Sequence, residues 1–470
     1  MLDTTAKRQT EICLFFCFRK KKGRKNILEL FRRLGKDTKT RNKLLITFGI
    51  LFGLLIGYRI PIPGVDTSYM TTIFQMFEGS GVGGFFNSMT GGSFEQMSIF
   101  ALSVSPYISA SIVLQLATIA FPRLEEIQKD GSVGHQKMER LTYVIAGLLS
   151  FILALAMSLK FGRDGLFLNY TWYMVVFATL VWTAGACFLV WIGQTITNKL
   201  VGNGISMILL FNILSTMPQD VRTVATTLSS DKEIAAKIAI IATVVIVILL
   251  LFAYVIVLES TEKRISIKNS HKVAGQMTGA NNNVLPIKLN AGGVMPIIYS
   301  STIMSIPVMA ANFFKMDTEK VLYKVLMAFN QSSWFNPETP WYTLGVLAYI
   351  PLTFFMAWFA SLKSFNAKDV ADNLRKNGSV INGIRPGQPT AEYLEKHSRR
   401  ILIIGTTMLI FVALLPTFIS NIFSIGGLSF GGTSIIIIVG VLIELRNTLN
   451  AQTSSVAYKT LIKKRKGGRK

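Results

Sequence analysis

Long apolar runs alternate with short polar or basic segments along the whole chain, and this pattern predicts membrane-spanning helices. A helix needs about 20 apolar residues to cross a bilayer. Ten runs reach or approach that length, at residues 43–58, 97–121, 141–160, 171–193, 204–217, 235–258, 291–314, 341–362, 401–420 and 432–445. A soluble protein with buried helices would need polar helix faces, which most of these runs lack. We therefore expect an all-α integral membrane protein with ten transmembrane helices.

Composition and charge support this interpretation and orient the chain. Of the 470 residues, 50% are hydrophobic and 16% are charged, against about 25% charged residues in soluble domains. The net charge is +24, and 40 of the 49 lysines and arginines lie in the segments predicted to be cytosolic. Positive charge is enriched on the inner side of membranes. We expect a multi-pass membrane protein with both termini cytosolic.

The spans divide the chain into two halves of five. A basic segment 1–42 precedes the first half, 43–217; an outer loop 218–234 leads to the second half, 235–449, and a basic tail 450–470 follows. Glycines interrupt the last span of each half, at 202–204 and 431–432. Such breaks are typical of inverted repeats with a functional site between the halves.

The chemistry-bearing residues argue against an enzyme. The sequence contains no GxxxxGK[ST], HExxH or GxSxG motif, and the spacing of Cys13, Cys17 and Cys187 indicates neither a disulfide framework nor a zinc site. Charge is almost absent from the spans, with Glu444 as the exception, whereas ion-coupled transporters place charges at membrane depth. We expect no cofactor and no metal, and a passive pore whose energy comes from elsewhere.

The second predicted span carries a polar stripe. On a helix, Val104, Ile108, Ser111, Gln115 and Thr118 share one face, apolar toward the outside and polar toward the inside. Small and hydroxylated residues can serve helix packing, or the stripe can line a hydrated channel that an apolar collar closes. Gln115 on this line favours the channel.

Three loops carry further signals. The glycine-rich stretch 78–97 is too polar to span, and it can form a re-entrant stopper or an exposed outer loop. The basic loops 259–290 and 363–400 can be flexible linkers or an ordered platform for a large cytosolic partner. The positive charge can also attract anionic lipid.

Six motifs in collinear order resemble the SecY family, which forms the channel of the bacterial Sec protein translocase. They are RIPIPGVD (59–66), SIFALSVSPYISASIVLQL (98–116), GNGISMILL (202–210), LPIKLNAGGVMPIIYSS (285–301), DVADNLRKNGSVINGIRPGQPTAEYL (369–394) and FGGTSIIIIV (430–439). The resemblance implies two five-helix halves, pseudo-symmetric and arranged like a clamshell around an hourglass pore. It also implies a protein-conducting channel in a bacterial cytoplasmic membrane, which passes secretory polypeptides across that membrane and membrane proteins sideways into lipid. A small-solute transporter and a ribosome-recruiting scaffold are the alternatives.

The resemblance assigns roles to particular positions. It implies a ring of apolar residues in the pore: Val104, Ile108, Leu209, Ile298 and Ile437. It implies a re-entrant plug at 78–93 that includes Phe85, Phe86, Asn87, Met89, Gly91 and Gly92. It implies a lateral gate lined by Ser109, Ser111, Gln115, Ser301, Thr302 and Ser305.

The resemblance also implies partners. The docking positions for a motor or ribosome are Arg264, Arg385, Pro386 and Gly387. The expected partners are the SecE and SecG subunits, the SecA ATPase, the ribosome, signal-sequence-bearing substrates, anionic lipid and a second copy of the heterotrimer.

Overall fold

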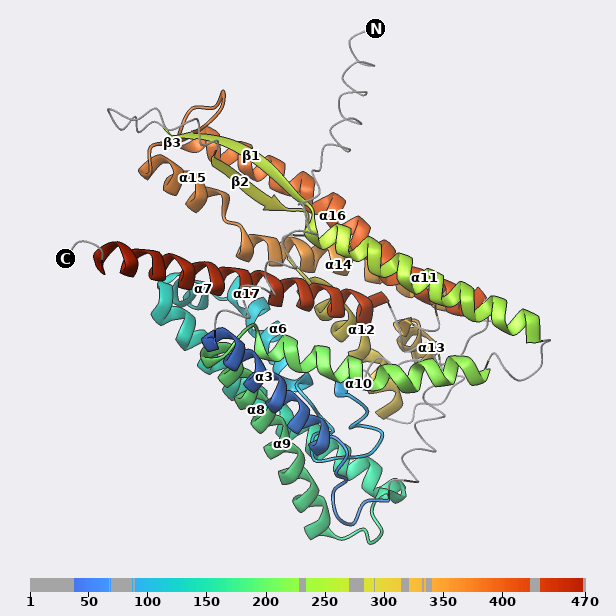
Figure 1. The fold of residues 1–470 in the computed structure, drawn as a ribbon. Helices are drawn as coiled ribbons and strands as arrows, with labels where there is room; N and C mark the ends of the chain where they lie inside the picture. The colour runs from blue at the N-terminus through green and yellow to red at the C-terminus, as the bar shows by residue number, and fades with distance from the viewer. Residues whose placement is uncertain are drawn as a thin grey trace.

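Long helices form most of the protein, and a small sheet projects beyond one end of them (Figure 1). The computed structural model describes residues 38–66, 68, 87, 89–227, 234–269, 283–290, 292–313, 321–331, 334, 340–422 and 432–467. The α-helices are α3 (Thr38–Gly57), α6 (Ser105–Ala120), α7 (Pro122–Lys129), α8 (Gly131–Phe161), α9 (Trp172–Lys199), α10 (Gly204–Thr227), α11 (Ile234–Ser260), α12 (Met295–Phe313), α13 (Val321–Met327), α14 (Leu344–Ser364), α15 (Ala367–Lys376), α16 (Gln388–Ile422) and α17 (Gly432–Gly467). Two short helices, η1 (Gly162–Leu166) and η3 (Pro340–Thr343), and the strands β1 (Glu262–Asn269), β2 (Asn283–Lys288) and β3 (Ser379–Ile381) complete the described elements.

The described helices match the predicted spans. Six of them are long and apolar enough to cross a membrane, and α6 with α7 forms a seventh candidate that bends by 110°. Three shorter apolar helices lie at Gly204–Gln219, Val245–Ser260 and Met295–Val308. Each of the ten predicted runs thus coincides with an apolar helix, and the fold class expected from the sequence is confirmed.

Proline sets both ends of the second span. Pro106 lies in the first turn of α6, where its missing N–H leaves no hydrogen bond unmade. Pro122 opens α7, and Phe121 before it is extended, with φ −116° and ψ 106°, as the residue preceding a proline usually is. The prediction of a helix from residue 97 was wrong for its first part. Ser103 has a φ of +48°, which no helix accepts, so Val104 immediately precedes the helix.

In the described part of the chain the buried side chains form three large clusters, one for each half and a third between the halves, and a small one around Val201 and Leu449. One cluster draws only on residues 62–186, and another only on residues 251–439. The third runs from Leu51 to Val441 and combines α3, α6, α9 and α10 with α12, α14 and α17. Each half therefore has its own core, and apolar side chains from both halves pack together where the halves meet.

Two glycines allow neighbouring segments of the first half to approach closely. A Cβ atom on Gly204 would lie 1.8 Å from the carbonyl oxygen of Gly193 in α9, and one on Gly185 would lie 2.2 Å from that of Ile99. Small residues commonly let helices pack closely in membranes. Close packing matters there because lipid tails are as apolar as the side chains, so burial of apolar surface does not drive helices together.

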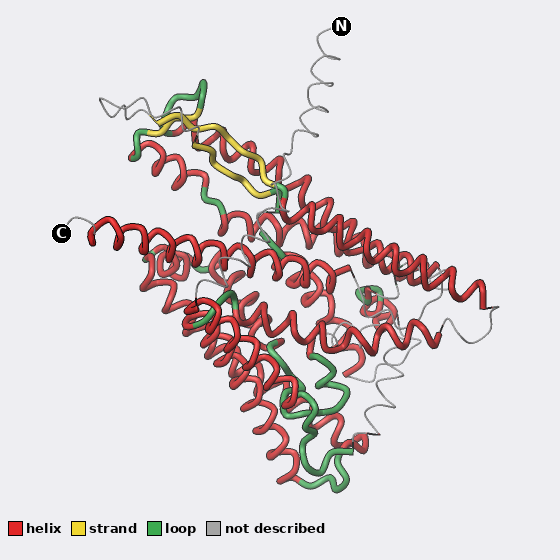
Figure 2. The backbone as a smooth tube through the Cα atoms, in the orientation of Figure 1, coloured by secondary structure: helices red, strands yellow, loops and turns green. Residues whose placement is uncertain are grey.

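The two basic loops, 259–290 and 363–400, meet in one antiparallel sheet, which Figure 2 shows beside α15 and α16. β1 and β2 belong to the first loop and β3 to the second, in the order β2-β1-β3. Ile265 pairs with Leu285, and Ile267 pairs with Ile381. The sequence allowed an ordered platform here but did not predict strands. β1 and β3 are more than 100 residues apart, and no local pattern shows that they pair.

Candidate functional site

A cavity of about 620 Å³, the vestibule, lies between helices of both halves. Its walls come from α6, α7, α8, α9 and α10 on one side and from α12, α14 and α17 on the other. Polar side chains line much of it, among them Gln115, Gln128, Glu139, Gln194 and Glu444. Glu444, the one carboxylate that the sequence places in a span, thus borders this cavity.

The five residues expected to form the pore ring belong to the apolar cluster between the halves. We call these five side chains the apolar constriction. Their exposed fractions are 0% for Val104, 5% for Ile108, 3% for Leu209, 4% for Ile298 and 0% for Ile437. Ile108, Leu209 and Ile298 also line the vestibule. The vestibule therefore borders large apolar side chains contributed by both halves, and such constrictions resist wetting.

A cluster of hydrogen bonds, the gate latch, joins α6 to α12. Nε2 of Gln115 donates to the hydroxyl of Tyr299 at 2.8 Å and to Oγ of Ser111 at 3.0 Å. The hydroxyls of Ser111 and Tyr299 lie 3.4 Å apart. Two gate positions expected from the sequence, Ser111 and Gln115, thus reach across the interface between the halves. Their partner Tyr299 was not assigned; its signal was a phenol inside an apolar span, which needs a hydrogen-bond partner when buried.

The other expected gate positions do not join this cluster. Ser301 accepts a hydrogen bond from Nε2 of Gln331 at 3.2 Å, so it faces away from the latch. Thr302 and Ser305 donate to carbonyl oxygens of their own helix. Ser109 is partly buried on α6 and does not line the vestibule.

The described end of the expected plug packs against the constriction. Phe85 and Phe86 lie outside the described residues. Met89 belongs to the same apolar cluster as the five constriction residues, and Gly91 and Gly92 have φ values of +69° and +79°. Asn87 is buried and donates from Nδ2 to Glu95 at 3.3 Å.

One buried asparagine that the sequence analysis missed holds this end in place. Nδ2 of Asn212, in α10, donates to the carbonyl of Met89 at 2.8 Å and to Oγ of Ser103 at 3.0 Å. A Cβ atom on Gly91 would lie 3.2 Å from the backbone of Asn212. Glycine thus suits both the positive φ and the close approach at this position.

The projecting sheet gathers positive charge. Arg264, on β1, bonds Glu262 at 2.8 Å and remains 39% exposed. Arg385 and Pro386 are exposed and Gly387 is half-buried, with φ +102°, between β3 and α16. Partial burial and the nearby Arg400 guanidinium lower the pKa of Lys263. The structure therefore brings the expected docking positions of the two loops into one unit.

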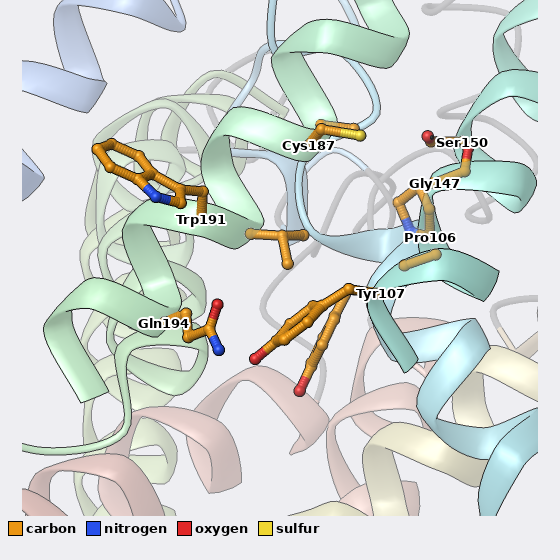
Figure 3. A pocket seen from close by; sticks show the side chains of 11 residues that line it. Pro106, Tyr107, Gly147, Ser150, Cys187, Trp191 and Gln194 are labelled. Atoms are coloured by element: carbon orange, nitrogen blue, oxygen red, sulfur yellow. Dashed lines mark hydrogen bonds between the residues drawn. The ribbon is translucent and has the colours of Figure 1, made fainter. Parts of the chain in front are cut away.

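A second cavity of about 220 Å³, the side pocket, lies between α6, α8 and α9 (Figure 3). Figure 3 shows Pro106 and Tyr107 on one wall and Cys187, Trp191 and Gln194 along another. Tyr107 stacks on Tyr143 with ring centroids 6.0 Å apart, and both line the vestibule as well. These tyrosines thus lie where the largely apolar side pocket adjoins the more polar vestibule.

Comparisons with known proteins agree with the architecture. The family model SecY matches residues 98–446. A Staphylococcus epidermidis protein, "Protein translocase subunit SecY", is 33% identical over 441 residues, covering 92% of this chain and 99% of that protein. The Escherichia coli K12 protein of the same name is 31% identical over 431 residues, covering 90% and 94%.

Solved structures share the fold. "The structure of a protein conducting channel" aligns with a TM-score of 0.60 at 16% identity, covering 87% of this chain and 92% of that one. "Sec61 in the Canine ribosome-channel complex from the endoplasmic reticulum" aligns with a TM-score of 0.57 at 16% identity and the same coverage. By the family match and its bacterial relatives, this chain belongs to the SecY family of protein translocase subunits.

Proposed function

We propose that polypeptides cross the membrane through the apolar constriction of this chain, entering from the vestibule. The observation that carries the proposal is the convergence of five residues from distant parts of the chain, Val104 to Ile437, in one buried cluster beside a polar cavity. A hydrated vestibule can hold an extended chain whose backbone groups need water or hydrogen-bond partners. Flexible apolar side chains can yield to that chain and close behind it, which excludes ions by keeping the constriction dry.

The gate latch gives the channel a sideways exit. Gln115 and Ser111 on α6 and Tyr299 on α12 are polar contacts that hold the halves together beside the vestibule. Parting them would open a path from the vestibule to lipid, through which an apolar segment would leave because transfer of apolar surface to lipid is favourable. The polar stripe on α6 thus has two uses: it wets the vestibule and it fastens the gate.

The projecting sheet is the proposed docking surface for a motor or a ribosome. Arg264 and Arg385 lie on one basic unit, which suits an acidic or phosphate-rich partner. The energy for transport would come from such a partner, SecA or the ribosome, and small subunits of the SecE and SecG kind would surround the helices. The charge asymmetry favours a cytosolic position for the sheet and both termini.

A trapping experiment tests the pore. In a background with Cys13, Cys17 and Cys187 replaced by serine, a single cysteine replaces Ile108. Membranes receive a secretory precursor with one cysteine at its middle, stalled by a folded C-terminal domain, and are then oxidised. We expect a disulfide adduct that requires both a functional signal sequence and an energised motor.

The matched control is a cysteine in place of Val113, on the same helix but 51% exposed. It should give no adduct with the chain in transit. If the stalled precursor crosslinks elsewhere on the protein but never at position 108, the pore assignment is wrong and a scaffold that only recruits ribosomes takes its place.

A further inference from the structure

The junction between the projecting sheet and α12 is held by one buried side chain. The β1–β2 ladder ends where the N–H of Leu289 donates to the carbonyl of Thr261 at 3.0 Å. The next residue, Asn290, is 6% exposed. Its Nδ2 donates to Oε1 of Glu259 at 2.6 Å and to the carbonyl oxygen of Gly293 at 2.7 Å. We call this pair of bonds the Asn290 clasp.

The clasp ties three elements together. Glu259 belongs to the last turn of α11, Asn290 follows β2, and Gly293 lies in the turn that leads into α12. Gly293 has φ +64°, a backbone conformation that glycine adopts without strain. Both N–H groups of the amide are used, and a partly buried carboxylate is costly without such donors. Breaking the clasp would leave the Glu259 carboxylate without its nearest hydrogen-bond donor.

The clasp lies close to the proposed gate along the chain. Val294 packs tightly against Gly440 of α17, where a Cβ would lie 2.0 Å from its side chain. The N–H of Ile298 donates to the carbonyl of Val294 at 3.4 Å, which begins α12. Ile298, of the constriction, and Tyr299, of the latch, therefore follow the clasp within about two helical turns.

We propose that Asn290 is a positioning residue that transmits the state of the docking sheet to the gate helix. This inference rests on the proposed pore and gate. While the clasp is closed, α12 keeps the position that seals the constriction and forms the latch. A partner that pulls on β1 and β2 loosens the clasp, and the inner end of α12 moves away from α6.

The charges around Glu259 suggest a substitution that would break the clasp with little change in side-chain size. Lys288 and Glu444 act electrostatically on the Glu259 carboxylate, Lys288 favourably and Glu444 unfavourably. Asn290→Asp has nearly the same size, but it removes both donors and sets a second carboxylate against Glu259. Losing a hydrogen bond to a charged group changes an equilibrium by about tenfold or more. The variant should favour the open gate by about that factor without any partner.

The test measures resting ion conductance in planar bilayers and the translocation of a precursor with a defective signal sequence. Asn290→Asp should raise both by about tenfold. Glu259→Gln keeps an acceptor for Asn290 and should have a smaller effect. The double variant Glu259→Gln with Asn290→Asp exchanges amide and carboxylate, so it can re-form the bond and should return both readouts toward wild type. A residue needed only for folding would lower protein levels and would not raise transport.

The matched control is Asn366→Asp. Asn366 caps α15 by accepting from the N–H of Lys368 at 3.1 Å, which aspartate can also do. This variant adds the same charge to the projecting unit and should behave like wild type.

The outcomes separate this inference from the proposed pore. If Ile108→Asn leaks but Asn290→Asp does not, the coupling is wrong and the pore stands. If neither leaks, the pore assignment itself is wrong. If Asn290→Asp fails to accumulate in the membrane, the other two variants decide. The clasp is overturned if Glu259→Gln leaves transport unchanged, or if the double variant Glu259→Gln with Asn290→Asp does not restore accumulation.

Discussion

The substitution Tyr299→Phe tests the gate latch with the smallest possible change. It removes one oxygen atom and leaves the ring in place, so packing around α12 is preserved. The lost hydroxyl accepts from Gln115 at 2.8 Å. Its 3.4 Å contact with Ser111 is too long to contribute much.

The expected magnitude follows from that single bond. A hydrogen bond contributes about 1 kcal/mol net, and interhelical bonds in membranes average about 0.6 kcal/mol. We therefore expect the closed gate to lose about 1 kcal/mol, which shifts its equilibrium toward the open state about fivefold. Gln115 keeps a partner in Ser111 at 3.0 Å, so the loss should not grow to the cost of an unpaired buried amide.

The assay compares the translocation of a precursor with a weakened signal sequence in four proteins: wild type, Tyr299→Phe, Gln115→Leu and the double variant. The latch predicts a gain of about fivefold for Tyr299→Phe, and a double variant below the product of the two single gains. Tyr173→Phe, at a residue that is 70% exposed, is the control and should change nothing. Independent, multiplicative effects of the two substitutions, or no effect of Tyr299→Phe, would refute the latch.

Three further predictions concern the constriction, the plug end and helix packing. Ile108→Asn places an amide in the apolar constriction and should raise resting ion conductance in planar bilayers about tenfold; unchanged conductance contradicts the constriction as the seal. Asn212→Ala leaves the Met89 carbonyl, now 2.8 Å from its donor, unpaired, and should lower thermal stability by about 1–3 kcal/mol; an unaltered melting temperature in detergent contradicts this. Gly204→Val sets a side chain where the Gly193 carbonyl lies 1.8 Å away and should greatly reduce membrane accumulation, whereas Gly49→Val, where a Cβ meets no atom within 4 Å, should accumulate normally.

Several features of this protein follow from local sequence. The hydrocarbon core of the bilayer sets the length and the apolar composition of a spanning helix, so the apolar runs alone were enough to locate the ten helices. Side chains three and four residues apart share a helix face, so the spacing of Ile108, Ser111 and Gln115 is enough to predict their common stripe. The charge of the loops likewise predicts which segments lie on the inner side of the membrane, and that orientation stays a prediction.

Other features depended on contacts between distant segments. Strand β3 pairs with β1 through Ile381 and Ile267, and no local pattern specifies a partner so far along the chain. The helical start at Ser105 was also missed, because an apolar run shows the composition of a span but not the backbone turn at Ser103.

The sequence by itself determined the class of this protein: an all-α membrane protein of the SecY family with ten apolar runs, basic loops and a polar stripe on its second span. Only the tertiary structure decided which side chains meet. Tyr299 faces Gln115, Asn212 holds Met89, and Asn290 bridges Glu259 and Gly293. The physical reason is that composition and periodicity act along one helix, whereas a hydrogen bond between helices depends on their mutual rotation and depth, which the packing of the whole bundle sets.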